Sequence, residues 1–160
     1  MEIRFAQAKD VTGILTLLKQ VGAVHHQGRP DIFRNNAQKY GASQVLSMLD
    51  SSKNPVFVAV EEEKVVGYGF CQIKTYEHDP VIADHTELYI DDLCVEEKRR
   101  GQGIGKAIYK AILKYAKLRK CYNVTLNVWS CNEGAMKFYE SLGLKPQKVG
   151  LETLLEEADA

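Results

Sequence analysis

Glycines and basic side chains gather over residues 99–106, where the sequence reads R-R-G-Q-G-I-G-K. Glycines let the backbone approach a ligand closely, and the first turn of a helix carries N–H groups without intrahelical partners, which favour an anion. Arg99, Arg100 and Lys106 add positive charge at the same place. This combination predicts a site that holds phosphate groups.

Two common phosphate-binding patterns do not fit these residues. A P-loop requires G-x-x-x-x-G-K-[ST], but Ala107 stands where the hydroxyl residue is needed and Arg100 where the first glycine belongs. The dinucleotide pattern G-x-G-x-x-G fails because its last glycine would be Lys106. What remains is R-x-x-G-x-G over residues 100–105, between an apolar strand and an amphipathic helix. That placement favours a ligand loop over an ordinary glycine turn.

Carboxylates precede the glycine segment, in E-L-Y-I-D-D-L-C-V over residues 87–95. Side chains alternate between the two faces of a strand, so Glu87, Tyr89 and Asp91 should share one face. We therefore expect two carboxylates to converge on one cleft, where a carboxylate can accept a proton or hold a cation.

Hydrophobic periodicity predicts the elements that position these residues. We expect strands over residues 3–8, 56–60, 65–76, 87–95 and 123–129, helices over 11–21, 37–49, 104–115 and 132–142, and a last β region over 144–155. The helical pattern fades at Gly22, and Gly28 and Pro30 are expected to keep residues 25–33 irregular. Asn132 and Gly143 are typical of the start and the end of the last helix.

Composition and charge exclude several classes of function. The 160 residues fit one domain, and 45% hydrophobic with 26% charged residues is ordinary for a globular protein. Lys+Arg and Asp+Glu both count 21, which argues against nucleic acid as the main partner, and no apolar run reaches the length of a membrane span. The four cysteines lack metal-binding spacing, which indicates reduced thiols in a cytoplasmic protein.

Two motifs resemble the GNAT N-acetyltransferase superfamily. R-x-x-G-x-G, residues 100–105, resembles the loop that binds the pyrophosphate of acetyl-coenzyme A. Residues 132–144, N-E-G-A-M-K-F-Y-E-S-L-G-L, are similar to the family's N-x-x-A-x-x-F-Y-x-x-x-G-F, with Leu144 in place of the usual Phe. The order of the predicted elements matches the family's along nearly the whole chain. The resemblance implies one domain over residues 1–160 with a mixed α+β GNAT fold, a central and mostly antiparallel twisted sheet flanked by about four helices.

The same resemblance implies how acetyl-CoA is bound. In the family the strand before the glycine loop splays away from its neighbour, and its free backbone groups hold the pantetheine arm. That role would fall on Leu93, Cys94 and Val95, with the pyrophosphate on Arg100, Gly101, Gln102, Gly103, Ile104, Gly105 and Lys106. Asn132 would reach the cofactor's arm, and Tyr139 would stand near the thioester sulfur as the general acid, since a leaving thiolate needs a proton donor.

The acceptor side has a candidate base. L-Y-I-D-D-L-C-V is similar to the acidic strand of the polyamine acetyltransferase branch, which implies Asp91 as the base and Glu87 as a second catalytic carboxylate. An acid here could instead bind the cationic substrate while water relays the proton. In the family the connection after the first helix overhangs the amine cleft, so the substrate-binding candidates are His26, Arg29, Phe33, Tyr89 and Asp91.

The expected function is transfer of an acetyl group from acetyl-CoA to a primary amine by direct attack in a ternary complex. The acceptor class stays open between a small molecule and a peptide or protein amine. The alternative is a non-catalytic module of the same fold that senses acyl-CoA. The glycine loop, Tyr139 and the carboxylates together favour the enzyme. We expect a homodimer and no metal, nucleic-acid or membrane partner.

Overall fold

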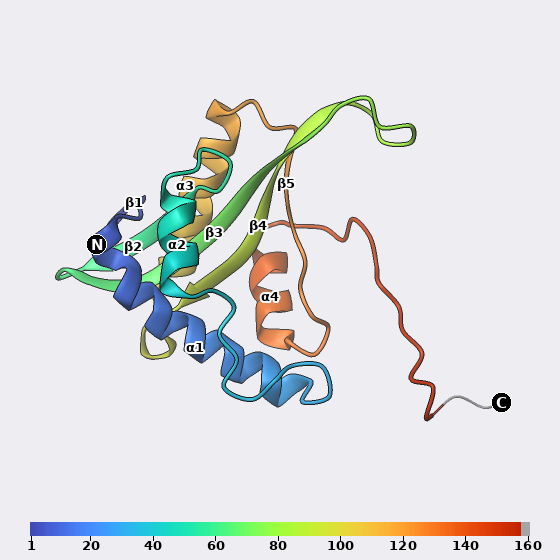
Figure 1. Ribbon diagram of the computed structural model, residues 1–160, viewed down its shortest axis with the longest axis horizontal. Coiled ribbons are helices and arrows are strands. Elements are labelled where there is room, and N and C mark those ends of the chain that lie inside the picture. The colour runs from blue at the N-terminus through green and yellow to red at the C-terminus, as the bar shows by residue number, and fades with distance from the viewer. Residues whose placement is uncertain (158–160) are drawn as a thin grey trace.

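The computed structural model describes residues 1–157 and contains a mixed sheet with helices on both sides (Figure 1). Its strands are β1 (Glu2–Phe5), β2 (Val56–Glu61), β3 (Lys64–Tyr76), β4 (His85–Val95) and β5 (Asn123–Leu126). Its helices are α1 (Val11–Gly28), α2 (Ala42–Leu49), α3 (Ile104–Leu118) and α4 (Glu133–Ser141), with short 3-10 turns η1 (Ala8–Asp10) and η2 (Glu97–Arg99).

The five strands lie in the order β1-β2-β3-β4-β5. Neighbours from β1 to β4 run antiparallel, whereas β5 runs parallel to β4. A parallel neighbour requires a crossover connection, and α3 supplies it between β4 and β5. The strands predicted over 56–60 and 65–76 are confirmed as β2 and β3, which form an antiparallel hairpin, and the α+β class with a mostly antiparallel sheet and four helices is confirmed too.

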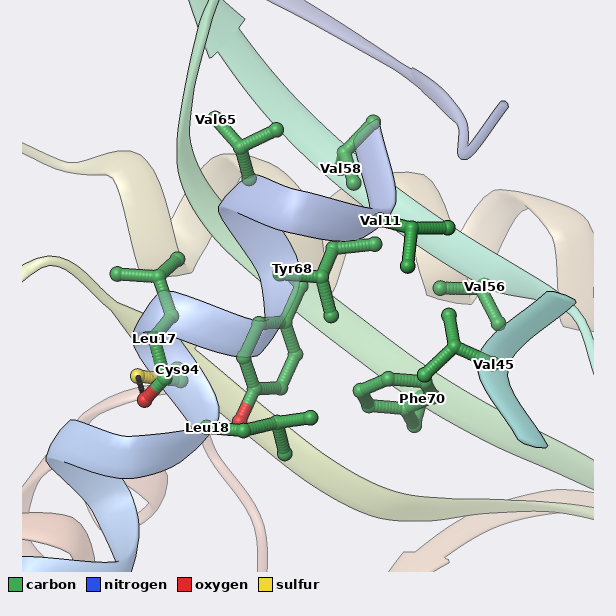
Figure 2. Packing of buried hydrophobic residues seen from close by; sticks show 11 residues of the cluster. Val11, Leu17, Leu18, Val45, Val56, Val58, Val65, Tyr68, Phe70 and Cys94 are labelled. Atoms are coloured by element: carbon green, nitrogen blue, oxygen red, sulfur yellow. Dashed lines mark hydrogen bonds between the residues drawn. The ribbon is translucent and has the colours of Figure 1, made fainter. Parts of the chain in front are cut away.

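The sheet separates two apolar cores. Figure 2 shows the core under α1 and α2, where Leu18 and Val45 meet Tyr68 and Phe70 of β3. The opposite face packs against α3. Glycine on β3 lets this helix come close, because a Cβ built on Gly67 would lie 2.9 Å from the Ile108 side chain.

The first helix is longer than the sequence predicted. The expectation that it ends at Gly22 is wrong, since α1 continues to Gly28 and includes His25 and His26 in its last turn. Gly22 serves a packing purpose instead. A Cβ on Gly22 would lie 2.1 Å from the carbonyl oxygen of Ala37, so the glycine lets the following segment lie against the helix.

The second helix is shorter than predicted. It begins only at Ala42, after Gly41, whose N–H donates to the Gln44 side chain at 2.8 Å. Residues 37–41 therefore form a connecting segment that passes over α1 instead of a helical turn. This segment carries Lys39 and Tyr40 to the edge of β4.

The C-terminal predictions divide into one confirmed element and two corrections. For α4, Asn132 Oδ1 accepts a hydrogen bond from the Ala135 N–H at 3.2 Å, and Gly143 follows the helix with φ +90°, so the predicted start and end are confirmed. The predicted strand over 123–129 stops at Leu126.

The predicted β region over residues 144–155 is wrong, because the described chain has no strand there. The segment runs away from the body in extended form (Figure 1), and Val149, Leu151 and Leu155 are exposed. With no neighbouring strand to pair with, its apolar pattern alone does not make a strand. Residues 158–160 lie outside the described part, so the single domain over 1–160 stays a prediction.

Candidate active site

Strands β4 and β5 pair over only part of the length of β4. Their parallel pairing runs from Glu87 with Asn123 to Ile90 with Leu126, and within the described chain β4 then continues to Val95 with β3 as its strand partner. Among the described residues, the backbone of residues 91–95 therefore has one edge without a strand partner. This is the splay expected before the glycine loop.

A β-bulge marks the point of separation. Phe70 pairs with Asp92, but the next residue of β3, Cys71, pairs with Ile90, so Asp91 is the extra residue on β4. A bulge breaks the alternation of side chains. As a result Asp91 and Asp92, although adjacent, both point to the face covered by α1 and α2, as their contacts with Tyr40 and Tyr68 show.

Asp91 is held by the segment between α1 and α2. Lys39 Nζ lies 3.0 Å from Asp91 Oδ1 and 3.3 Å from the Asp91 backbone oxygen. The hydroxyl of Tyr40 donates to Asp91 Oδ2. The Asp91 side chain is 11% exposed and the Lys39 side chain 47%. Burial, followed by the hydrogen bond to Asp91, raises the pKa of Tyr40, which keeps this phenol protonated.

Asp92 forms a second polar centre that the sequence reasoning missed. Its Oδ2 accepts a hydrogen bond from the Tyr68 hydroxyl at 2.7 Å. Burial raises the pKa of Asp92, although the Tyr68 hydrogen bond and the charges of Lys39 and His25 act in the other direction. The signal in the sequence was the adjacent D-D pair, whose second member a simple two-residue alternation assigns to the wrong face.

Tyr139 lies on α4. Burial raises its pKa, and the charges of Asp92 and Cys94 raise it further. A phenol with a raised pKa stays protonated at neutral pH and can donate its proton. Tyr139 therefore has the protonation state that a general acid needs.

Glu87 and Tyr89 do not join that centre. Glu87 accepts hydrogen bonds from Tyr76 Oη at 2.9 Å and Thr125 Oγ1 at 2.8 Å. Tyr89 receives a hydrogen bond from Asn127 Nδ2 at 3.3 Å. Four residues of strand separate Glu87 from Asp91, or about 13 Å at the usual rise. The two predicted catalytic carboxylates therefore have different partners.

The glycine loop has the conformation that only glycine adopts easily. Gly101 and Gly103 have φ of +80° and +81°, and Gly103 occupies the N-cap of α3. A Cβ on either residue would meet nothing within 4 Å, so the space beside both Cα atoms is open. Gly105 differs, because its Cβ would lie 2.9 Å from the Phe138 ring. The loop is thus open on the ligand side and packed against α4 behind it.

The basic residues of the loop have distinct surroundings. Arg99 forms an ion pair with Glu61 and donates from Nε to Gln102 at 3.0 Å. Arg100 Nε donates to the Val95 carbonyl at 3.4 Å, which ties the loop to the end of β4. Lys106 is exposed in the first turn of α3, whereas Ile104 is buried beneath it. Arg99 is therefore held by protein, and Arg100 and Lys106 stand at the open side.

The strand residues predicted to bind through their backbone keep their side chains inside. Cys94 is buried, with Sγ 3.9 Å from the Leu17 carbonyl, and burial followed by the charge of Asp92 raises its pKa to about 12 (Figure 2). Leu93 and Val95 pack toward the α3 core. The Cys94 side chain is thus buried, and those of Leu93 and Val95 are partly buried. Asn132 uses Oδ1 to cap α4.

An aromatic group stands at the end of α1. Phe33 stacks on His25 with ring centroids 4.8 Å apart and meets Trp129 edge-on at 5.0 Å. His26 Nδ1 lies 2.7 Å from the Phe33 carbonyl oxygen, which accepts only, so Nδ1 carries the proton. His25 and Trp129 were not among the predicted site residues. His25 stood in the segment expected to be irregular, and Trp129 stood at the end of the strand predicted over 123–129, so no motif joined the two.

Arg29 is directed away from this group. It forms ion pairs with Asp31 at 2.8 Å and with Glu152 of the C-terminal segment at 2.5 Å. The hydrogen bonds that Arg29 donates to these two carboxylates raise its pKa. Of the predicted substrate-binding residues, the structure therefore brings together His26 and Phe33. Arg29 instead contacts the C-terminal segment through Glu152.

Within residues 1–157 no group of three or more His, Cys, Asp or Glu side chains could hold a metal ion. Across the same described residues, none of the helices has the length and apolar character needed to cross a membrane.

Comparisons with known proteins match most of the chain. The model of the acetyltransferase (GNAT) family matches residues 25–144. The solved structure of a tetramutant of the BH1408 protein from Bacillus halodurans is 36% identical, with a TM-score of 0.92, and the match covers 97% of this chain and 100% of that one.

Two curated relatives match parts of the chain. N-acetyltransferase 8B of Homo sapiens is 34% identical over 100 residues, 62% of this chain and 42% of the relative. Thialysine N-epsilon-acetyltransferase of Bos taurus is 34% identical over 79 residues, 49% of this chain and 44% of the relative. The match thus spans less than half the length of either relative.

Proposed function

Because the chain belongs to the acetyltransferase (GNAT) family, we propose that it transfers an acetyl group from acetyl-CoA to a primary amine in a ternary complex. The observation that carries the proposal is Asp91 at the point where β4 leaves β5, together with the protonated phenol of Tyr139 on α4. A carboxylate that accepts a proton and a phenol that donates one suit the two halves of acyl transfer.

Acetyl-CoA is proposed to lie across the splay. The first-turn N–H groups of α3 and the open faces of Gly101 and Gly103 suit the pyrophosphate, with Arg100 and Lys106 nearby. The free backbone edge of residues 93–95 suits the amides of the pantetheine arm. Asn132, at the start of α4, is proposed to approach the same arm through its amide nitrogen.

Asp91 is proposed as the base and Tyr139 as the acid. The acceptor ammonium gives a proton to Asp91, its nitrogen attacks the thioester carbonyl, and Tyr139 protonates the leaving thiolate. Asp92 is proposed to act through Tyr139, since its charge helps to hold the phenol in the protonated form. Glu87 is proposed to act further along the strand, where it can attract a second positive charge of an extended acceptor.

The acceptor is proposed to be a cationic amine with an apolar part. Carboxylates on β4 suit the cation, and the rings of His25, Phe33 and Trp129 suit the apolar part. His26 is proposed to hold Phe33 in place through the hydrogen bond to the Phe33 carbonyl oxygen. Tyr89 is proposed to line the acceptor site beyond Asp91. The relative named for the N-epsilon amine of thialysine is consistent with an amine on an extended side chain.

The proposal is tested with purified protein, acetyl-CoA and a panel of primary amines. The panel should include di- and polyamines, amino acids and lysine-containing peptides, with thiol release as the readout. Turnover should be highest for amines that carry a further positive charge. It should be lowest for amines of the same length that carry none. Tight CoA binding with no turnover on the whole panel would contradict the enzyme and favour an acyl-CoA sensor.

Two further properties are proposed. The C-terminal segment exposes Val149, Leu151 and Leu155, and one edge of the short strand β5 lacks a strand neighbour among the described residues, so a second copy could cover both in a homodimer. Light scattering should then show a dimer for the wild type and a monomer for Leu151→Glu. The free thiols of Cys71 and Cys94 support a reducing, cytoplasmic location.

A further inference from the structure

Lys39 occupies the place where an acceptor amine would have to stand. Its Nζ lies 3.0 Å from the Oδ1 of the proposed base, Asp91, and 3.3 Å from the same residue's backbone oxygen. That carbonyl belongs to the bulged residue, at the point where β4 leaves β5. A primary amine therefore already contacts both a proton acceptor and the free edge of the splayed strand.

The fold holds this amine in place through its neighbours. The segment that carries Lys39 lies against α1 at Gly22, where any side chain would collide with Ala37. Next to Lys39, Tyr40 packs on Phe70 with ring centroids 5.3 Å apart and donates to Asp91 Oδ2. Backbone contact and aromatic packing thus fix both ends of the Lys39–Asp91 pair.

An ordinary surface ion pair would explain only part of these features. Lys64 and Glu96 form such a pair at 2.9 Å, and their side chains are 67% and 16% exposed. The Lys39–Asp91 pair has similar length and similar exposure on the acidic side. It differs in two ways that matter for chemistry, because its amine also meets a strand carbonyl and its carboxylate belongs to the bulged residue where β4 leaves β5.

We infer that Lys39 is an internal acceptor, whose ε-amine the protein acetylates with its own active site. The inference rests on the proposed function. It adds a modification site and a means of regulation. While Lys39 is charged, it competes with external cationic amines for Asp91. Once it is acetylated it is neutral and cannot form the ion pair, so Asp91 becomes free to receive an external ammonium.

The reaction balances with the groups present. The Lys39 ammonium gives one proton to Asp91, and the freed lone pair attacks the thioester carbonyl of acetyl-CoA. The N–C bond forms and the C–S bond breaks, and Tyr139 protonates the thiolate. The second proton on the nitrogen returns to Tyr139 through solvent, and Asp91 releases its proton to water. The products are acetyl-Lys39, CoA thiol and one proton.

The test uses the full chain and acetyl-CoA without any added amine. Acetylation of Lys39 and of Lys64 is followed over time by peptide mass spectrometry. Lys39 should react about tenfold faster or more, because an oriented amine has a high effective molarity, although Lys64 is the more exposed side chain. The rate per molecule should not change with protein concentration, since donor site and acceptor lie in one chain.

Two variants and an unfolded control sharpen the result. Lys39→Arg keeps the positive charge beside Asp91 but cannot form the amide, so the label at position 39 should vanish while that at Lys64 persists. Asp91→Asn should slow labelling of Lys39 alone. Heat-unfolded protein gives the intrinsic reactivities, which should be equal for the two lysines.

Equal labelling of Lys39 and Lys64 in the folded protein would overturn the inference, and so would a rate per molecule that rises with protein concentration. Failure of the inference is distinguishable from failure of the proposed function. If the amine panel is acetylated and Lys39 is not, only the internal acceptor is refuted. If CoA neither binds nor is released with any amine, the proposed function itself fails.

Discussion

Phe138 of α4 lies directly over Gly105 of α3, so that a Cβ added to the glycine would stand 2.9 Å from the ring's Cζ. The residue after Phe138 is Tyr139, the proposed acid. The glycine loop and the acid are therefore joined by one packing contact. A change at the loop that displaces Phe138 must also move the phenol.

We predict that Gly105→Ala lowers both cofactor binding and turnover. The added methyl group has to push α4 outward, which should raise the KM for acetyl-CoA and lower kcat about tenfold, an activation free energy of about 1.4 kcal/mol. Steady-state kinetics measure both constants. Gly134→Ala is the matched control, since it adds a methyl group to α4 with its nearest contact at 3.9 Å. An effect of the same size in both variants would argue against the contact.

Gly103→Asp should weaken binding of acetyl-CoA by about tenfold or more, equivalent to at least about 1.4 kcal/mol. The substitution places a carboxylate beside the proposed pyrophosphate position at the N-terminus of α3. It also strains the backbone, because φ is +81° at this residue. Gly103→Ala carries the strain without the charge and serves as the control. Calorimetry that finds equal affinities for the two variants would remove the pyrophosphate from this loop.

Tyr139→Phe should reduce kcat by roughly 10²-fold and leave the KM for acetyl-CoA nearly unchanged, as expected for loss of a positioned acid. Because burial and the charge of Asp92 raise the pKa of Tyr139, the wild-type enzyme should keep this acid protonated throughout the neutral and mildly alkaline range. A kcat within about twofold of wild type would mean that the phenol only packs or that the thiolate leaves without help.

Asp91→Asn should lower kcat/KM most at low pH, where the acceptor amine is fully protonated and most needs a base. Glu87→Gln, four residues along the same strand, should have a smaller effect because Tyr76 and Thr125 hold that carboxylate elsewhere. A pH–rate profile of each variant separates two roles. Equal loss at every pH would assign Asp91 to electrostatic binding of the substrate rather than to proton removal.

Asp10 should make folding stability sensitive to acid. Burial alone would raise its pKa, but hydrogen bonds from Arg4 and from the Gln7 N–H lower it overall, below the ordinary 3.8. A lowered pKa stabilises the fold above the unfolded-state pKa, and this stabilisation is lost as the pH falls through the folded-state value. Urea unfolding should show Asp10→Asn less stable by about 1–3 kcal/mol at pH 7. The difference from wild type should shrink below about pH 4, and a constant difference would contradict the ion pair.

The sequence predicted those parts of the site that depend on local backbone chemistry. Gly101 and Gly103 adopt positive φ as a glycine loop requires, and Asn132 caps α4. Such features depend on a few adjacent residues, so a motif carries them. The strands β2, β3 and β4 could be predicted equally well, because each pairs with the next strand along the chain.

What the sequence could not predict depends on contacts between distant segments. Gly22 looked like the end of a helix, but it is tolerated within α1 because Ala37 passes against it. The bulge at Asp91 arises from pairing with β3 and moves Asp92 onto the same face. Lys39 and Tyr40 were assigned to a helix, although both contact Asp91 of β4, which lies 52 and 51 residues further along the chain. No periodicity within either segment records these contacts.

The parallel pairing of β4 with β5 also fixes when the site can assemble during synthesis. Glu87 and Asn123 pair only after the whole of α3 has been made and has docked on β3. Loop closure of this kind is slow compared with a hairpin. A nascent chain halted before Asn123 could form the meander from β1 to β4, with Asp91 in place, but it would have no second wall opposite that carboxylate. The parallel wall of the proposed site is thus the last part of the sheet to be synthesised.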